Sequence, residues 1–93
     1  MYHYNFPEIK LKPTHTLIKQ IKKVREESEE ANDEAIVQMV TGNNDENVLL
    51  ECCDTLIAAE TLHRMMVKVY GEDRVNAAIN ATIIKNKNRN YFT

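Results

Sequence analysis

The sequence has few of the residues that break or constrain a polypeptide chain. Its 93 residues include two glycines, two prolines, two cysteines and no tryptophan. So few helix breakers, together with many Glu, Lys, Ala, Leu and Ile residues, favour an all-helical fold. No apolar run approaches the roughly 18–20 residues of a membrane helix, so we expect no membrane partner. The N-terminal stretch lacks the apolar segment of a signal peptide, and we therefore expect a cytoplasmic protein.

The two cysteines do not form a recognisable covalent or metal-binding framework. Cys52 and Cys53 are adjacent, which suits neither a disulfide framework nor a zinc motif. We expect them to be small buried residues in a reducing compartment.

A chain of 93 residues forms one domain at most. Such a domain buries only about 60–65 % of its unfolded surface, so its own core is marginal. This favours a homo-oligomer, either a homodimer or a homotetramer.

Charged residues are unevenly distributed, although the net charge is only -2. Residues 26–73 hold 13 of the 14 acids and only two bases. Residues 10–25 hold six bases, residues 74–89 hold four, and neither stretch contains an acid. The pattern argues against stable nucleic-acid binding, which needs a basic surface, and against an acidic disordered tail. It leaves open a site for a ligand that carries cations and phosphates together.

Hydrophobic spacing divides the chain into an N-terminal arm, residues 1–13, and a single helical domain, residues 14–93. The arm has no helical period, and its two prolines disfavour helix at the residues before them. Spacings of three and four predict a first helix that Thr14 or Thr16 caps and that Gly42 ends. Three aromatic residues of the arm are free to pack on the domain or on a partner: Tyr2, Tyr4 and Phe6.

Two further helices are predicted. The second runs from about Asp45 to Tyr70, and Asn43 with Glu46 resembles a capping box at its start. Its middle is apolar on nearly every side, so we expect a partner subunit to complete its burial. A third helix begins at Glu72 and fades over residues 86–89. The stripes predicted to be buried are Leu17, Ile21, Val24, Ala31, Ala35 and Met39 in the first helix, and Val48, Cys52, Leu56, Ala59, Leu62, Met66 and Val69 in the second.

Two acidic motifs have the spacing of metal ligands. Residues 26–30 form E-E-x-x-E and residues 51–54 form E-x-x-D. Glu27 with Glu30, and Glu51 with Asp54, therefore share one face of a helix each. In both pairs the two carboxylates lie at about -60° and -120° from the apolar stripe, on the same flank. An unpaired carboxylate in the apolar second helix costs several kcal/mol. Four converging carboxylates predict a hard divalent cation: Mg²⁺, Mn²⁺ or Ca²⁺.

The order of these motifs resembles that of the MazG-like all-α nucleoside triphosphate pyrophosphohydrolases. Relatives in this superfamily are the dimeric dUTPases, the dCTP pyrophosphatases and phosphoribosyl-ATP pyrophosphatase. Twenty residues separate the two acidic motifs, and residues 85–91 look like the family's K-N-x-x-(K/R)-x-Y ending. The resemblance covers residues 17–92. It implies a four-helix-bundle core completed by homo-oligomerisation. It also implies Mg²⁺-dependent hydrolysis of a (d)NTP to the (d)NMP and pyrophosphate, by water attack at the α-phosphorus.

The resemblance also implies roles for individual residues. The implied Mg²⁺ ligands, for which Mn²⁺ is a possible substitute metal, are Glu27, Glu30, Glu51 and Asp54. Glu26 matches the first Glu of the motif and would order the attacking water. The implied phosphate-binding residues are Lys85, Asn86 and Arg89. Lys23 is an additional candidate, and Tyr91 would either close over a base or dock on the partner subunit.

Other interpretations fit part of the pattern. A phosphoribosyl-ATP pyrophosphatase-like enzyme shares the acidic motifs, and a substrate panel would separate it from an enzyme acting on a (d)NTP. A non-catalytic helical oligomer, in which residues 26–34 form a solvated face, predicts no thermal shift with Mg²⁺ plus nucleotide. A carboxylate-bridged redox protein uses E-x-x-H pairs, but Glu30 and Asp54 stand where the histidines would fall. The motifs specify neither the base nor the sugar.

Overall fold

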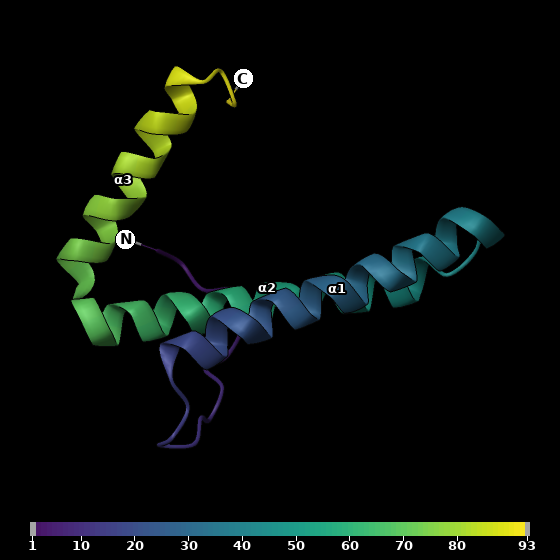
Figure 1. The fold of residues 1–93 in the computed structure, drawn as a ribbon, viewed down its shortest axis with the longest axis horizontal. Helices are drawn as coiled ribbons and strands as arrows, with labels where there is room; N and C mark the ends of the chain where they lie inside the picture. The colour runs from purple at the N-terminus through teal and green to yellow at the C-terminus, as the bar shows by residue number, and fades with distance from the viewer. Residues whose placement is uncertain (1, 93) are drawn as a thin grey trace.

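The structure, a computed structural model, describes residues 2–92 and contains three helices. They are α1 (Leu17–Thr41), α2 (Asp45–Tyr70) and α3 (Glu72–Asn88), and no strand occurs in residues 2–92. This confirms the predicted all-α class. α1 and α2 form an antiparallel hairpin, and α3 leaves it at the end opposite the α1–α2 turn (Figure 1). None of the helices within the described residues combines the length and the apolar character needed to cross a bilayer.

The ends of α1 follow from two residues with cap-forming chemistry. Of the two threonines predicted as caps, Thr16 takes this position, and its hydroxyl accepts a hydrogen bond from Lys19 N at 3.3 Å. At the other end Gly42 adopts φ 70°, a left-handed conformation that costs a residue with a Cβ about 1–2 kcal/mol. Its N–H donates to the Gln38 carbonyl at 2.8 Å. Gly42 therefore ends α1 and lets the chain turn back.

The predicted capping box of Asn43 and Glu46 is wrong. The residue that precedes α2 is Asn44, at φ 117°, and its side chain makes no cap hydrogen bond. The Asn43 side chain is occupied locally, because its Oδ1 accepts from Asn44 N at 2.9 Å. The Asn44 amide instead donates back to α1, to the Glu34 carbonyl at 3.1 Å and to the Glu34 carboxylate at 2.5 Å. This contact fixes the turn of the hairpin.

The faces on which α1 and α2 pack are more polar than the sequence analysis predicted. The buried residues on α1 are Gln20 and Glu27, and those on α2 are Ala58, Glu60, Thr61 and Met65. Ile21 follows Gln20 by one residue, about 100° around the helix, and is 53 % exposed. Met39 and Leu56, also in the predicted stripes, are 75 % and 55 % exposed. The predicted stripes are therefore only partly right: Leu17, Val24 and Ala31 are half-buried beside Gln20 and Glu27, whereas the exposed members point away from the interface that forms in the single chain.

The predicted burial of the two cysteines is also wrong in the single chain. Cys52 and Cys53 are both exposed and unbonded. They lie on the N-terminal half of α2, near Leu49 and Leu50, which are 58 % and 61 % exposed. The physical reason is that α1 covers only one side of this apolar helix.

The single chain is extended for its size. Its radius of gyration is 15.8 Å, whereas a folded chain of this length is expected near 12 Å. Its accessible surface is 7423 Å², about 1,900 Å² more than the roughly 5,500 Å² typical of a folded monomer of this mass. The buried hydrophobic residues are Ala58, Met65 and Val75. Much apolar surface therefore remains uncovered.

The N-terminal arm packs along the C-terminal half of α2. Both carboxylate oxygens of buried Glu60 accept from Asn5 N, at 3.0 and 2.9 Å, and one also accepts from Phe6 N at 3.0 Å. Arg64 donates to the Phe6 carbonyl at 2.8 Å and lies over the Tyr4 ring at 4.0 Å. Burial acts to raise the pKa of Glu60, but these hydrogen bonds and the Arg64 charge outweigh it and hold that pKa below its usual value. Glu60 thus fastens the arm to α2.

Candidate metal centre and adjoining pocket

Three carboxylates from the two hairpin helices converge at one place. Glu27 of α1 and Glu51 and Asp54 of α2 each offer an oxygen, and these oxygens lie within 4.8 Å of one another. Glu27 is buried, Glu51 is half-buried and Asp54 is exposed, so the group extends from the helix interface to the surface. The antiparallel pairing of α1 and α2 places the two motifs opposite each other. The structure thus brings together three of the four metal ligands predicted from the sequence.

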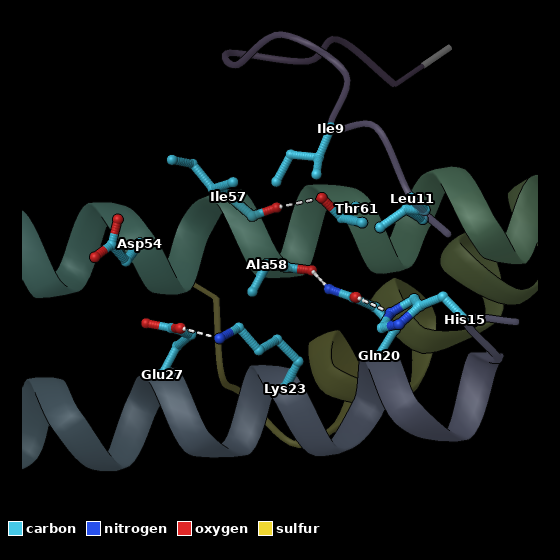
Figure 2. A pocket seen from close by; sticks show the side chains of 10 residues that line it. All are labelled: Ile9, Leu11, His15, Gln20, Lys23, Glu27, Asp54, Ile57, Ala58 and Thr61. Atoms are coloured by element: carbon cyan, nitrogen blue, oxygen red, sulfur yellow. Dashed lines mark hydrogen bonds and ion pairs between the residues drawn. The ribbon is translucent and has the colours of Figure 1, made fainter. Parts of the chain in front are cut away.

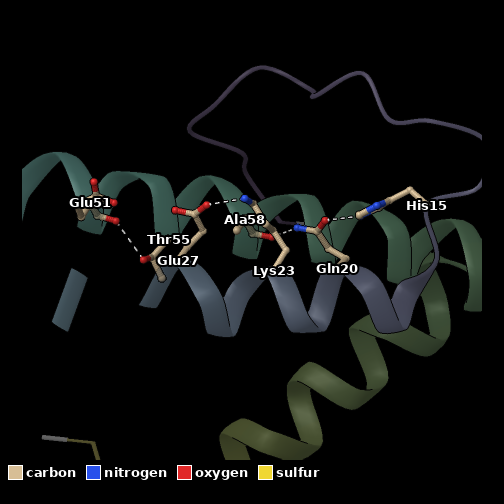
Figure 3. A network of polar contacts seen from close by, with 7 residues as sticks. All are labelled: His15, Gln20, Lys23, Glu27, Glu51, Thr55 and Ala58. Atoms are coloured by element: carbon tan, nitrogen blue, oxygen red, sulfur yellow. Dashed lines mark hydrogen bonds and ion pairs between the residues drawn. The ribbon is translucent and has the colours of Figure 1, made fainter. Parts of the chain in front are cut away.

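The polar environment of this cluster fits a cation. Glu51 Oε2 is buried and has no hydrogen-bond partner among the residues that the structure describes. Lys23 forms an ion pair with Glu27, Nζ to Oε1 at 2.8 Å (Figure 3). The hydrogen bond and charge of Glu27 raise the pKa of Lys23, which keeps it cationic. One lysine against three carboxylates leaves negative charge unbalanced, and an all-oxygen donor set suits a hard divalent ion.

Glu30 lies beside the cluster rather than within it. The negative charge of Glu27 raises the pKa of Glu30, and burial, the charge of Glu51 and a hydrogen bond with Glu27 act in the same direction. Glu30 therefore experiences the field of the other carboxylates, one helical turn along α1. Of the four predicted ligands, Glu30 is thus the one that the structure does not place among the converging oxygens.

The remaining predicted site residues lie outside the group of converging carboxylates. Glu26 is exposed on α1, next to Glu27 in the chain. The predicted phosphate-binding residues Lys85 and Asn86 lie on α3, with Arg89 at its C-cap. Tyr91 follows and is 69 % exposed. In the described chain α3 packs on α2 and not on α1, and it leads away from the hairpin (Figure 1). A single chain therefore does not bring its basic tail to its own carboxylates.

An apolar pocket of about 420 Å³ adjoins the carboxylates (Figure 2). Glu27 and Asp54 form part of its wall, so the pocket and the cluster share two residues. Ile57, Ala58 and Thr61 of α2 line one side, together with residues of α1. The arm contributes Ile9 and Leu11 to its lining, and His15, between the arm and α1, completes it.

A chain of hydrogen bonds fixes the α1 side of this pocket (Figure 3). Buried Gln20 donates through Nε2 to the Ala58 carbonyl at 2.8 Å. Its Oε1 lies 2.7 Å from His15 Nε2, which donates if the ring carries its proton there. Gln20 thus joins α1, α2 and the segment that precedes α1.

Sequence reasoning missed Gln20 and Glu60, because both are polar residues and were assigned to no buried face. A pattern for Gln20 was present. Leu17, Gln20, Val24, Glu27 and Ala31 recur at alternating spacings of three and four. When polar residues are included, this period identifies the face of α1 that packs on α2. Nothing in the sequence distinguishes Glu60, whose partners are 54 and 55 residues away.

Comparisons with known proteins add no family assignment. No protein-family model matches the chain, and neither a curated protein nor a solved structure does.

Proposed function

We propose that this protein is a Mg²⁺-dependent nucleoside triphosphate pyrophosphohydrolase with a MazG-like fold. The observation that carries the proposal is the convergence of Glu27, Glu51 and Asp54 within 4.8 Å, with a buried Glu51 oxygen that no described group satisfies. An isolated buried carboxylate oxygen is costly, and a divalent cation supplies the missing partner. The apolar pocket that shares two of these residues gives room for the organic part of a substrate.

In this proposal Glu27, Glu51 and Asp54 hold the metal, with Glu30 as a fourth ligand from the next turn of α1. Bound Mg²⁺ would neutralise negative charge on the phosphate oxygens of the substrate. Mn²⁺, which shares the preference for oxygen ligands, is expected to substitute.

The reaction is hydrolysis at the α-phosphorus of a (d)NTP. Glu26, exposed and next to Glu27 in the chain, orients a water molecule by accepting a hydrogen bond from it. The water oxygen bonds to the α-phosphorus as the bond to the oxygen that bridges to the β-phosphorus breaks. The products are the (d)NMP and pyrophosphate, and the water proton passes to Glu26 and then to solvent. As in other phosphoryl transfers, positioning and electrostatic stabilisation supply most of the rate enhancement.

We further propose that the active form is a homodimer or homotetramer in which a second copy completes a four-helix bundle. The surface excess of about 1,900 Å² per chain amounts to about 3,800 Å² for two chains, within the roughly 2,000–5,000 Å² in total that obligate dimer interfaces bury. Apolar residues on the outer faces of α1 and α2, such as Ile21, Met39 and Leu56, supply that surface.

The assembly also bears on the phosphate-binding tail. Because α3 leads away from its own hairpin, a clamp made of Lys85, Asn86 and Arg89 would come from the α3 of another copy. Such an arrangement would place cationic groups opposite the acidic edge of the neighbouring hairpin. Arg89→Ala should therefore raise KM for the nucleotide without weakening Mg²⁺ binding.

The test is pyrophosphate release from a panel of (d)NTPs and phosphoribosyl-ATP with Mg²⁺. We expect release from at least one (d)NTP, loss with EDTA, and a loss of at least about 100-fold in Glu51→Gln and in Asp54→Asn. Glu29→Gln, which removes an exposed acid of the same motif region, serves as the matched control and should retain activity. Undiminished activity in both cluster variants would reject the site. Absence of any hydrolysis would favour a non-catalytic oligomer.

A further inference from the structure

The pocket beneath the N-terminal arm has the dimensions and lining of a small-molecule site. Its volume of about 420 Å³ lies in the usual range of roughly 300–1,000 Å³ for such sites. Ile57 and Ala58 of α2 and Ile9 and Leu11 of the arm give it apolar walls, and Figure 2 shows Ile9 directed toward α2. Asp54 and Glu27, which belong to the metal cluster, form part of its wall.

The length of the pocket along α2 matches the distance from the phosphate of a nucleotide to its base. Asp54, Ile57 and Thr61 lie successively on one side of the helix, and seven residues of helix rise span about 10 Å. A nucleotide whose phosphate is held through a cation at Asp54 would thus extend its sugar and base along α2 toward Thr61. Apolar walls around a flat group suit the faces of a base.

Away from the carboxylate cluster, the polar side chains of the pocket form hydrogen bonds within the protein. Gln20 Nε2 donates to the Ala58 carbonyl, and Gln20 Oε1 pairs with His15 Nε2. The Thr61 hydroxyl donates to the Ile57 carbonyl at 2.9 Å. These bonds hold the three side chains in place and leave one amide proton of Gln20 unused, so apolar side chains supply most of the contact surface inside the pocket.

We propose that this arm-covered pocket is the nucleobase site, and that it selects bases by size and apolar contact rather than by their hydrogen-bonding edges. The inference rests on the proposed function. It adds that several bases are accepted. Apolar selection distinguishes similar ligands only about 10- to 200-fold, whereas a site built on matched hydrogen bonds reaches 10⁴ or more.

Glu60 holds the arm over the pocket, because its carboxylate accepts hydrogen bonds from the backbone of residues 5 and 6. Ile9 and Leu11 follow within the same arm. The arm is therefore a part of the site that can be changed without touching the metal ligands.

The test is methyl NMR of the full chain labelled at isoleucine, titrated with the four deoxynucleoside monophosphates and Mg²⁺. Inorganic tripolyphosphate with Mg²⁺ is the base-free probe. We expect the Ile9 and Ile57 methyl signals to shift with the monophosphates and not with tripolyphosphate, while Ile36 and Ile83 stay unchanged. Ile9→Ser should weaken monophosphate binding about five- to tenfold, and Ile84→Ser on α3 is the matched control.

The outcomes separate this inference from the proposed function. Pyrophosphate release without Ile9 or Ile57 shifts would overturn the base site and leave the enzyme proposal standing. Ile9 and Ile57 shifts without any hydrolysis would support the base site and reject the enzyme. Affinities for the four bases that differ by more than about 1,000-fold would contradict selection by apolar contact.

Discussion

Neutralising Glu51 should stabilise the metal-free protein and abolish its response to Mg²⁺. In the metal-free state an oxygen of Glu51 lies within 4.8 Å of oxygens of Glu27 and Asp54. Two unit charges at that separation repel by about 3 kcal/mol at an effective dielectric constant of ~20. Solvent screens exposed Asp54, and Lys23 balances part of the Glu27 charge, so we expect a net gain of about 1–2 kcal/mol in Glu51→Gln.

The assay is thermal unfolding, followed by far-UV circular dichroism at a fixed protein concentration. For a domain of this size 1 kcal/mol changes Tm by about 4–8 °C, so Glu51→Gln should unfold roughly 5–10 °C above the wild type in EDTA. Mg²⁺ at ten times its Kd should stabilise the wild type by about 1.4 kcal/mol. The variant should show little of this shift, because one ligand of the site is lost.

Glu29→Gln is the control, since Glu29 is an exposed acid of α1 that pairs only loosely with Arg25 at 3.6 Å. It should change neither the metal-free Tm nor the Mg²⁺ response by more than the experimental scatter. A lower Tm of Glu51→Gln in EDTA, combined with an intact Mg²⁺ shift, would refute the view that the three carboxylates repel one another and together bind a metal ion.

Four further changes test other parts of the account. Burial acts to raise the pKa of Glu60, but hydrogen bonds from the arm hold it below the ordinary 4.5. Docking of the arm therefore contributes its full stability above about pH 4.5, and this stability is lost as pH falls through the lowered pKa. Glu60→Gln should therefore flatten the acid branch of Tm against pH, and an unaltered branch would contradict the role of Glu60. Leu56→Arg should convert the proposed oligomer to a monomer in light scattering, and a retained oligomer would exclude this face from the interface. Gln20→Ala should lower the free energy of unfolding in urea by about 1–3 kcal/mol, because Gln20 bonds both to the Ala58 carbonyl and to the segment before α1; a neutral effect would show that the network is not structural. Gly42→Ala should cost about 1–2 kcal/mol through its left-handed φ of 70° alone, since the added Cβ meets no atom within 4 Å; no loss in the same urea assay would contradict this.

The sequence was sufficient to predict where the helices begin and end. The spacing of apolar residues, Thr16 as a cap and Gly42 as a stop are local features, and the structure places α1 between them. The acidic motifs were likewise predictable as pairs, because residues three apart share a helix face. That Glu27 and Glu51 would meet across the hairpin follows from the short antiparallel turn.

The sequence was less informative about which faces pack. The interface between α1 and α2 contains Gln20 and Glu27, whose hydrogen bonds and ion pair compensate for their burial, and periodicity of apolar residues alone does not reveal them. The path of the arm depends on Glu60, whose contacts are far away in sequence. The direction of α3 depends on tertiary contacts around buried Val75, so the position of the basic tail could not be predicted.

The most direct test of the proposed function is hydrolysis of a (d)NTP in ¹⁸O-labelled water with Mg²⁺, with both products analysed by mass spectrometry. We predict that the products are a (d)NMP and pyrophosphate, and that the label enters the (d)NMP alone, because water attacks the α-phosphorus. Glu51→Gln should form neither product at a comparable rate. Label in pyrophosphate, release of orthophosphate as the first product, or no turnover of any (d)NTP would contradict the proposal.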